Sequence, residues 1–309
     1  MPIHLPPMTR RRFLARTIGA GAALVLPAAA RGAETADPNR FALLSDTHIP
    51  SDPKVTSRGV NMVDHLRRAV AEVAALDGPV AGAIVSGDLA HLVGKKEDYR
   101  QLAPLLRKLT GAKVPVHLAL GNHDHRQNFA AVLTDHKQAA PPLVGRYVSV
   151  VEAPRANWFL LDSLDKTNTT PGLLGAEQRV WLAAALDARK DKPAIVVDHH
   201  DPYKPPAPAK GKPARKTSGL RDVDELFELL VPRKHVKAFV FGHRHRWARG
   251  QREGIHLIDV PTTAYVFGKS QPSAWVLAQL QTDGIRLELR SLDGKHADHG
   301  KKIDLPWRS

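Results

Sequence analysis

Five short clusters of polar side chains in this sequence could bind metal ions, and each follows an apolar run of strand length. The clusters are Asp46-Thr47-His48, Gly87-Asp88, Gly121-Asn122-His123-Asp124, Asp198-His199-His200 and Gly242-His243-Arg244-His245. Any one of them has an ordinary explanation as a turn, a helix cap or a structural histidine. Five clusters of the same chemistry, each at an expected strand end, indicate one shared site.

The expected strand ends would bring these side chains together. In sheets built from βα units, the carboxyl ends of the strands converge on one crevice. Carboxylates and imidazoles crowded there would repel and lose hydration unless cations balanced them. The set suits two ions that share a bridging carboxylate such as Asp88, and nitrogen and oxygen ligands without thiolates favour Fe, Mn or Zn. The candidate ligands are Asp46, His48, Asp88, Asn122, one histidine of the 199–200 pair, His243 and His245.

The last cluster alternates between histidine and arginine. In an extended or turning backbone, residues i and i+2 point to the same side. We therefore expect His243 and His245 each to face one metal ion, and Arg244 to point elsewhere.

The five clusters, in this order, resemble the signature of the calcineurin-like metallophosphoesterases. That signature reads Asp-x-His, Gly-Asp, Gly-Asn-His-Asp or Glu, His and Gly-His-x-His, and here it spans Asp46 to His245. The resemblance implies an α/β (α+β) fold of four layers, αββα, in which two central mixed sheets are flanked by helices. It also implies that Asp46, His48, Asp88 and His245 hold one ion, and that Asp88, Asn122, a histidine of the fourth cluster and His243 hold the other.

Two histidine assignments depart from the family pattern. Relatives usually have His-His-Pro-Pro or His-x-Pro, whereas this chain has His199-His200-Asp201-Pro202. Alignment on the strand end favours His199 as the ligand and strict alignment on His-x-Pro favours His200; we take His199 and place His200 on the substrate side. His91 follows Asp88 by three residues, where related purple acid phosphatases carry a metal-binding tyrosine. Because His48 fills that coordination role, we expect His91 to face the substrate.

The expected reaction is attack on phosphorus by a hydroxide that bridges the two cations. His123 is not needed as a ligand, so we expect it to stabilise or protonate the leaving group. Asp124 would orient the ring of His123 and keep it protonated.

Two further stretches, "GNHDHRQNF" and "LGAEQRVWL", resemble the bacterial cyclic-nucleotide and glycerophosphodiester phosphodiesterases. The resemblance implies that Arg126 binds substrate and that the reaction is phosphodiester hydrolysis on a small molecule. A phosphomonoesterase or a nuclease would use the same centre. A non-catalytic metal-binding envelope protein would need a decayed ligand set, and the core positions of this chain are intact.

Apolar runs alternate with segments of helical period from Arg40 onward, which predicts one layered domain over residues 34–309. From Ile255 strands follow one another and are expected to complete a second sheet. Pro104 predicts a kink or a late start in its helix.

The Pro- and Lys-rich segment 201–219 would be a domain linker or, as we favour, a flap over the site. Its basic residues could also bind the backbone of a nucleic acid. The expected strands are 40–45, 80–86, 114–120, 158–161, 194–197, 236–241, 255–260, 274–280 and 285–289.

The first 33 residues have the composition of an export signal. Thr9-Arg10-Arg11-Arg12-Phe13-Leu14 resembles the twin-arginine signal, and the run 18–30 is too short and weakly apolar for a stable membrane anchor. We expect recognition by the Tat translocase, cleavage after Ala30 or Ala33, and a periplasmic or secreted enzyme. Cleavage of the export signal would remove five arginines and lower the formal net charge from +14 to +9, so the protein would stay basic.

The sequence contains no cysteine. This absence excludes disulfides, thiolate ligands and a lipoprotein anchor.

Overall fold

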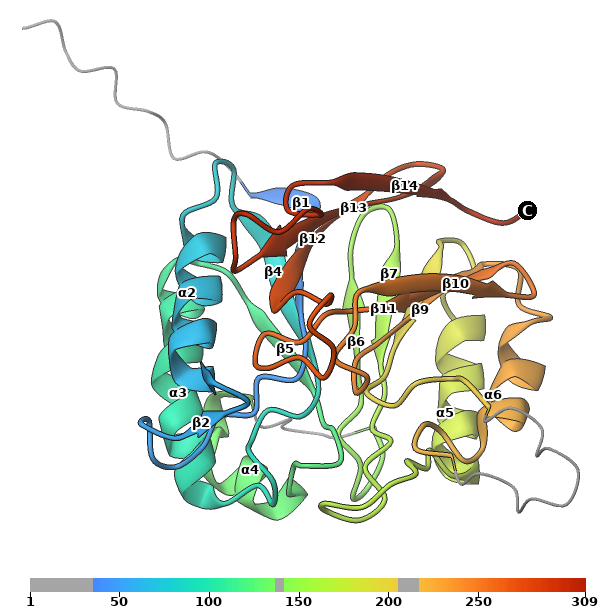
Figure 1. Ribbon diagram of the computed structural model, residues 1–309. Coiled ribbons are helices and arrows are strands. Elements are labelled where there is room, and N and C mark those ends of the chain that lie inside the picture. Colours follow the sequence, from blue (N-terminus) through green and yellow to red (C-terminus); the bar gives the residue numbers. More distant parts are fainter. Residues whose placement is uncertain (1–35, 137–141, 205–216) are drawn as a thin grey trace, which may run out of the picture. The chain divides into compact units, whose positions relative to one another are not determined.

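Two six-stranded sheets lie at the centre of the protein (Figure 1). The computed structural model describes residues 36–136, 142–204 and 217–309. In the first sheet, the order β14-β13-β12-β1-β4-β5 places three parallel strands beside three antiparallel ones. Its strands are β1 (Asp37–Leu44), β4 (Val80–Ser86), β5 (Val116–Ala119), β12 (Ala274–Leu280), β13 (Gly284–Ser291) and β14 (Lys302–Pro306).

The second sheet has the order β10-β11-β9-β8-β7-β6. Its four central strands are parallel, and both edge strands are antiparallel to their neighbours. The strands are β6 (Ser149–Glu152), β7 (Asn157–Leu160), β8 (Ala194–Val197), β9 (Val236–Phe241), β10 (Ala248–Arg252) and β11 (Ile255–Asp259). A short hairpin of β2 (Thr56–Ser57) and β3 (Val60–Asn61) lies outside both sheets.

The inner strands of both sheets are buried on both faces, and successive side chains of such a strand enter different cores. Phe41 and Leu43 of β1 join the core between the sheets, where the ring of Phe41 lies 5.1 Å from that of Trp158 on β7. Ala42 and Leu44 point the other way, into the core under the first pair of helices. This period of two makes β1 apolar along its buried length and fixes the order of the layers.

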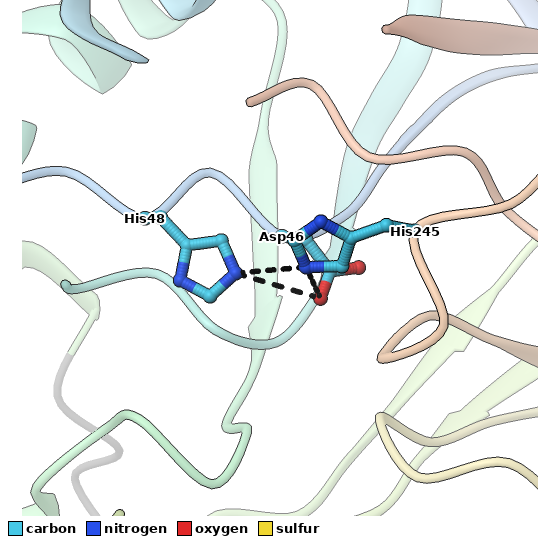
Figure 2. A group of neighbouring side chains, drawn as sticks. All are labelled: Asp46, His48 and His245. Carbon is cyan, nitrogen blue, oxygen red and sulfur yellow. Dashed lines mark hydrogen bonds and ion pairs between the residues drawn. The ribbon is translucent and has the colours of Figure 1, made fainter. Parts of the chain in front are cut away.

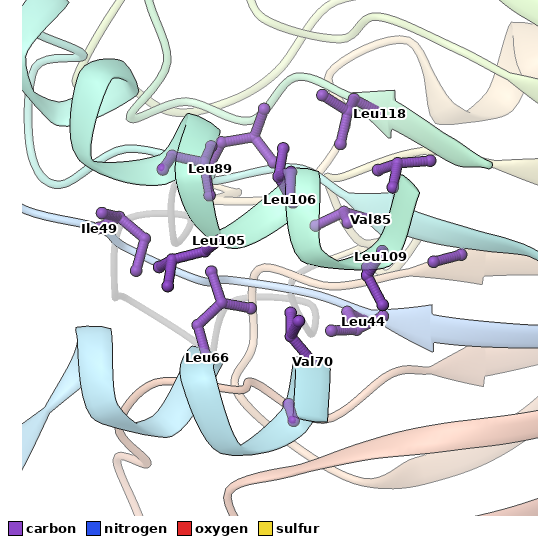
Figure 3. Close-up of a cluster of buried hydrophobic side chains, with 14 of the residues drawn as sticks. Leu44, Ile49, Leu66, Val70, Val85, Leu89, Leu105, Leu106, Leu109 and Leu118 are labelled. Carbon is purple, nitrogen blue, oxygen red and sulfur yellow. The ribbon is translucent and has the colours of Figure 1, made fainter. Parts of the chain in front are cut away.

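Helices cover the outer face of each sheet. On the first sheet, α2 (Met62–Ala74) and α3 (Lys96–Gly111) direct Leu66, Val70 and Leu106 at strand residues such as Leu44 and Val85 (Figure 3). On the second sheet, the buried residues of α5 (Ala176–Asp187) and α6 (Val223–Leu230) pack on β7, β8 and β9. The short α4 (Arg126–Val132) and η1 (Thr134–His136) follow β5. The expected four-layer αββα fold with two mixed sheets is confirmed.

Two expectations about individual elements are wrong. The strands after residue 270 do not complete the second sheet, because β12 pairs with β1 and draws β13 and β14 into the first sheet. For the helix that contains Pro104, the late start is wrong, since α3 begins at Lys96 and continues past the proline, whereas the alternative of a kink stays a prediction. Acidic Glu97 and Asp98 in its first turn favour this earlier start.

Parts of the expected organisation lie outside the described residues. These are the export segment 1–33 and residues 205–216 of the expected flap, which stay predictions. Among the helices that the structure does describe, none combines the length and apolar character needed to cross a bilayer.

Candidate active site

The polar clusters of both sheets meet at the carboxyl ends of the strands. Asp46, Asp88, His199 and His243 each lie two residues beyond their strands β1, β4, β8 and β9, and Asn122 lies three beyond β5. Parallel strands present these ends at the same edge of a sheet, as the sequence predicts. The structure therefore places residues from position 46 to position 245 around one site.

One group consists of Asp46, His48 and His245, whose side chains point toward one another (Figure 2). The two Nε2 atoms of His48 and His245 are 3.0 Å apart, and Nε2 of His245 is 3.3 Å from Oδ1 of Asp46. Two ligands at right angles, each about 2.1 Å from an ion, would be about 3 Å apart. The three buried side chains therefore have the spacing of ligands to a shared cation.

A second group consists of Asp88, His199 and His243. Nε2 of His199 lies 3.3 Å from Oδ2 of Asp88, and Nε2 of His48 lies 3.7 Å from the same oxygen. Asp88 thus stands between the two groups, where a carboxylate that bridges two cations is expected.

Several buried polar atoms of the site lack a hydrogen-bond partner among the described residues. Oδ1 of Asn122 and Nε2 of His199 are two of them. The other ring nitrogen of His199 donates to the carbonyl of Ser86 at 2.9 Å, and Nδ1 of His245 donates to the carbonyl of Tyr265 at 2.5 Å. Such outer hydrogen bonds fix imidazole rings so that Nε2 can bind metal. The donor set fits a site for metal ions.

The backbone at the site is held in an unusual conformation. A positive φ is uncommon in residues other than glycine and persists where the surroundings enforce it. Gly121 has no positive φ, and a side chain is excluded there by space: a Cβ on it would lie 2.2 Å from Oδ1 of Asp88. Five of the candidate ligands have a positive φ: Asp46 (50°), His48 (45°), Asp88 (48°), His243 (69°) and His245 (51°).

Burial and charge set the protonation of these groups. Burial lowers the pKa of His48 to about 3 and that of His243 to about 4, so both rings are neutral and able to bind metal. Burial also disfavours charge on His199, but the adjacent Asp88 carboxylate outweighs it and raises the pKa of His199 to about 10. A metal ion would replace that proton, because only the neutral imidazole is a ligand.

His123 reaches the site, but Asp124 does not hold it. Nδ1 of His123 lies 2.7 Å from the carbonyl oxygen of Leu92, and Nε2 lies 3.9 Å from Oδ2 of Asp88. The fully buried Asp124 accepts hydrogen bonds from the backbone amides of residues 89, 90 and 121 and from the hydroxyl of Tyr99. The expected orientation of His123 by Asp124 is therefore wrong, because the carboxylate joins the loops after β4 and β5.

Arg126 is also placed differently from the expectation. Its guanidinium donates to the buried Asp162 carboxylate at 2.7 and 2.8 Å. Asp162 in turn accepts from the backbone amides of Tyr147 and Leu164. The guanidinium thus joins loops within the protein, and the expectation that Arg126 binds substrate is wrong.

The two histidines expected on the substrate side lie near the centre. The ring of His200 is 4.9 Å from that of His243, its Nδ1 is 2.7 Å from Oγ of Ser163, and its Nε2 has no hydrogen-bond partner in the described part of the chain. The ring of His91 is 6.5 Å from that of His48. Their roles toward a substrate stay predictions.

A cleft of about 530 Å³ opens over the candidate ligands. His243, Arg244, His245 and Arg246 all contribute to its lining. The guanidinium of Arg244 contacts the Tyr203 ring and no candidate ligand, which fits the expectation that Arg244 does not face a metal ion. The repeated His-Arg pattern could have revealed Arg246, whereas no sequence signal singles out Tyr265 or Phe267. The remaining lining residues include Asn168, Thr170 and Ser218.

Comparison with known proteins agrees with this geometry. Residues 39–247 match the model of the calcineurin-like phosphoesterase family. The chain belongs to this family. It is therefore a metal-dependent phosphoesterase.

Individual relatives extend the comparison. A protein of Rhodopseudomonas palustris named "Probable cyclic nucleotide phosphodiesterase" is 28% identical over 80% of this chain and 90% of its own length. A 3′,5′-cyclic-nucleotide phosphodiesterase of Nostoc sp. is 26% identical over 83% of this chain and 90% of its own length. The crystal structure of a dimetal phosphatase from Danio rerio, 16% identical, covers 88% of this chain and 100% of its own with a TM-score of 0.65. That likeness concerns the fold of this phosphoesterase.

Proposed function

We propose that this protein hydrolyses phosphodiesters at a centre of two metal ions. The main observation behind this proposal is that Asp88 lies between two groups of ligand-type side chains. Nε2 of His199 is 3.3 Å and Nε2 of His48 is 3.7 Å from Oδ2 of Asp88. The relatives named as cyclic-nucleotide phosphodiesterases support the diester as the substrate class. Bound metal ions supply a water of lowered pKa and neutralise charge on the phosphate.

The protein's own side chains would complete the reaction. His123 is the imidazole at the edge of the centre, and its Nδ1 donates to the Leu92 carbonyl, so Nε2 remains free to face a leaving oxygen. In the protonated ring, Nε2 would donate that proton as the ester bond breaks. Asn122 and His199 would hold metal through Oδ1 and Nε2, the atoms that lack other partners in the described residues.

The metals follow from the donor set. Imidazole nitrogens and carboxylate or amide oxygens suit Fe, Mn or Zn, and the chain has no thiolate to offer. The basic charge of the chain suits an anionic small molecule. A phosphomonoesterase or nuclease would share this centre.

The proposal is tested by restoring metals to the stripped protein one at a time. We expect turnover of bis(4-nitrophenyl) phosphate with Mn, Fe or Zn, no turnover without metal, and less turnover of 4-nitrophenyl phosphate. Asp88→Asn should lower kcat/KM by at least about 10²-fold, because it weakens both proposed metal positions. Turnover of the diester by the metal-free protein would reject the proposal. Faster turnover of the monoester than of the diester with every metal would reject it too.

A further inference from the structure

The cleft over the candidate ligands has more positive charge than a simple diester requires. Among its described lining residues, Asp88 is the one acidic side chain, and it belongs to the proposed metal centre. Arg244 and Arg246 line the same cleft. A phosphodiester carries a single negative charge, which the proposed metal ions would already neutralise.

The guanidinium of Arg244 is held in place without using its hydrogen-bond donors. Its Cζ lies 4.6 Å from the centre of the Tyr203 ring, and its Nη1 lies 3.8 Å from Oδ2 of Asp259. That distance is too long for a hydrogen bond. Asp259 is fully buried at the end of β11 and accepts no hydrogen bond from Arg244, so the guanidinium donors stay available to a ligand in the cleft.

Arg246 adds a second set of free donors. In the described ranges, neither the Arg246 nor the Arg244 side chain donates a hydrogen bond, and Arg246 is exposed. Each guanidinium has five N–H donors and binds phosphate through two of them at once. The cleft is also lined by uncharged groups, Asn168, Thr170 and Ser218, and by the aromatic residues Tyr265 and Phe267.

We propose that Arg244 and Arg246 form a subsite for a second, non-reacting phosphate, so that the preferred substrate is a phosphodiester that also carries a terminal phosphomonoester. This inference rests on the proposed diesterase function. Phe267 is 56% exposed at this cleft, and its ring stacks on His245 at 4.4 Å and has the guanidinium of Arg58 over it at 4.9 Å, so a substrate would meet the edge of the ring. In the reaction, the oxygen of water forms the new bond to the diester phosphorus, the bond from phosphorus to the leaving oxygen breaks, and that oxygen takes a proton.

Two dinucleotides that differ by one phosphate provide the test. ApA has the diester alone, and pApA has the same diester with a 5′-phosphate. With the metal-loaded protein, we expect kcat/KM for pApA to exceed that for ApA by about tenfold or more, mainly through KM, and the products of pApA to be two molecules of AMP. Salt should reduce the preference, because the subsite is partly exposed.

Variants identify the residues responsible. Arg244→Gln and Arg246→Gln should each lower the pApA/ApA ratio about fivefold to tenfold, whereas Arg249→Gln, an exposed arginine beside Trp247 and outside the cleft, should keep it. An unchanged ratio in both variants, or equal rates for the two dinucleotides, would overturn the subsite. Release of ApA and phosphate from pApA would overturn it too, because the terminal phosphate would then be the reacting group. If neither ApA nor bis(4-nitrophenyl) phosphate were cleaved, the diesterase function itself would fail.

Discussion

A main-chain carbonyl, and not a carboxylate, holds the ring of His123. The carbonyl belongs to Leu92, whose φ of 58° turns the peptide toward the imidazole 2.7 Å away. Because Nδ1 is used in this contact, Nε2 is the nitrogen that faces the cleft. The loop after β4 therefore contributes both Asp88 and the support for His123.

Removal of this imidazole should separate catalysis from metal binding. His123→Ala should lower kcat for bis(4-nitrophenyl) phosphate by about 10²- to 10⁴-fold, since general acid catalysis contributes that much. Metal content, measured by elemental analysis, should stay near the wild-type value, because the seven proposed ligands are untouched. His123→Asn can donate a hydrogen bond but cannot transfer a proton, so partial activity in it would indicate charge stabilisation. An unchanged kcat in the alanine variant would remove His123 from the mechanism.

The sequence predicted which residues gather at the site better than it predicted their partners. Asp46, Asp88, Asn122 and His243 converge because each follows a strand, and strand ends are visible as the ends of apolar runs. The partner of Arg126 is Asp162, 36 residues away, and no local pattern specifies such a contact. Roles that depend on one hydrogen bond therefore needed the structure.

At the scale of elements, two turns that follow strands approach each other closely. The turn after β5 passes against the turn after β4, and a Cβ on Gly121 would lie 2.2 Å from the Asp88 carboxylate and 2.4 Å from its amide nitrogen. Gly111, at the end of α3, has nothing within 4 Å of the corresponding position. The two glycines thus form a matched pair.

Gly121→Ala should displace Asp88 and lower kcat/KM by at least about 10²-fold, with a stability loss of roughly 1–3 kcal/mol. Gly111→Ala should keep activity and leave stability unchanged or raised by up to about 1 kcal/mol, because alanine favours the helix. Kinetics and thermal unfolding of the two proteins check both effects. Full activity in Gly121→Ala would mean that the two turns do not have to approach closely.

The end of β11 should impose a pH dependence on stability. Burial raises the pKa of Asp259 from 3.8 to about 9, so the folded protein holds a proton that the unfolded chain releases between these values. The stability from the protonated carboxyl is present below the unfolded pKa and is lost as the pH rises toward the folded pKa. Asp259→Asn cannot ionise, so its free energy of unfolding relative to the wild type should rise between about pH 5 and about pH 8.5, by up to about 1.4 kcal/mol per pH unit, and its Tm advantage should grow accordingly.

The matched control is Asp304→Asn. Asp304 is exposed on β14, and its ion pair with Arg286 lowers its pKa, so the carboxylate is charged in both folded and unfolded states over this range. The difference in Tm between this variant and the wild type should stay constant. Parallel Tm profiles for Asp259→Asn and the wild type would show that Asp259 is ionised when folded.

Strands buried on both faces were predictable, and of the edge strands β5 was predicted whereas β6, β10 and β14 were not. The expected bounds of β4, β8, β9 and β12 agree with the structure, because inner strands of stacked sheets are continuously apolar. The edge strand β10 reads Ala-Arg-Gly-Gln-Arg and is nowhere buried, so it has no apolar signal. Which sheet β12 joins depends on its pairing with β1, more than 200 residues earlier, and local sequence does not encode it.

At the scale of the whole molecule, export is a prediction that the described residues do not address. In a bacterial host with a twin-arginine system, we predict that the protein is found in the periplasm and is shortened by cleavage after Ala30 or Ala33. Arg10→Lys combined with Arg11→Lys should retain the full-length chain in the cytoplasm, as fractionation and intact mass would show. Arg16→Lys is the matched control, because it lies outside the arginine pair. Equal export of both variants would contradict a twin-arginine route.

The return of the chain's last strands to β1 has a consequence for engineering. All five motifs lie before residue 247, yet β12 covers one edge of β1, and the backbone of Thr263 donates to the carbonyl of Ser45 at 2.9 Å. A fragment that ended after the last motif would expose that edge of β1. It would also lack Tyr265, whose carbonyl oxygen accepts the hydrogen bond from Nδ1 of His245. The segment that contains the five motifs is therefore not expected to fold and function by itself, because the last sixty or so residues pair with β1 and support the site residues.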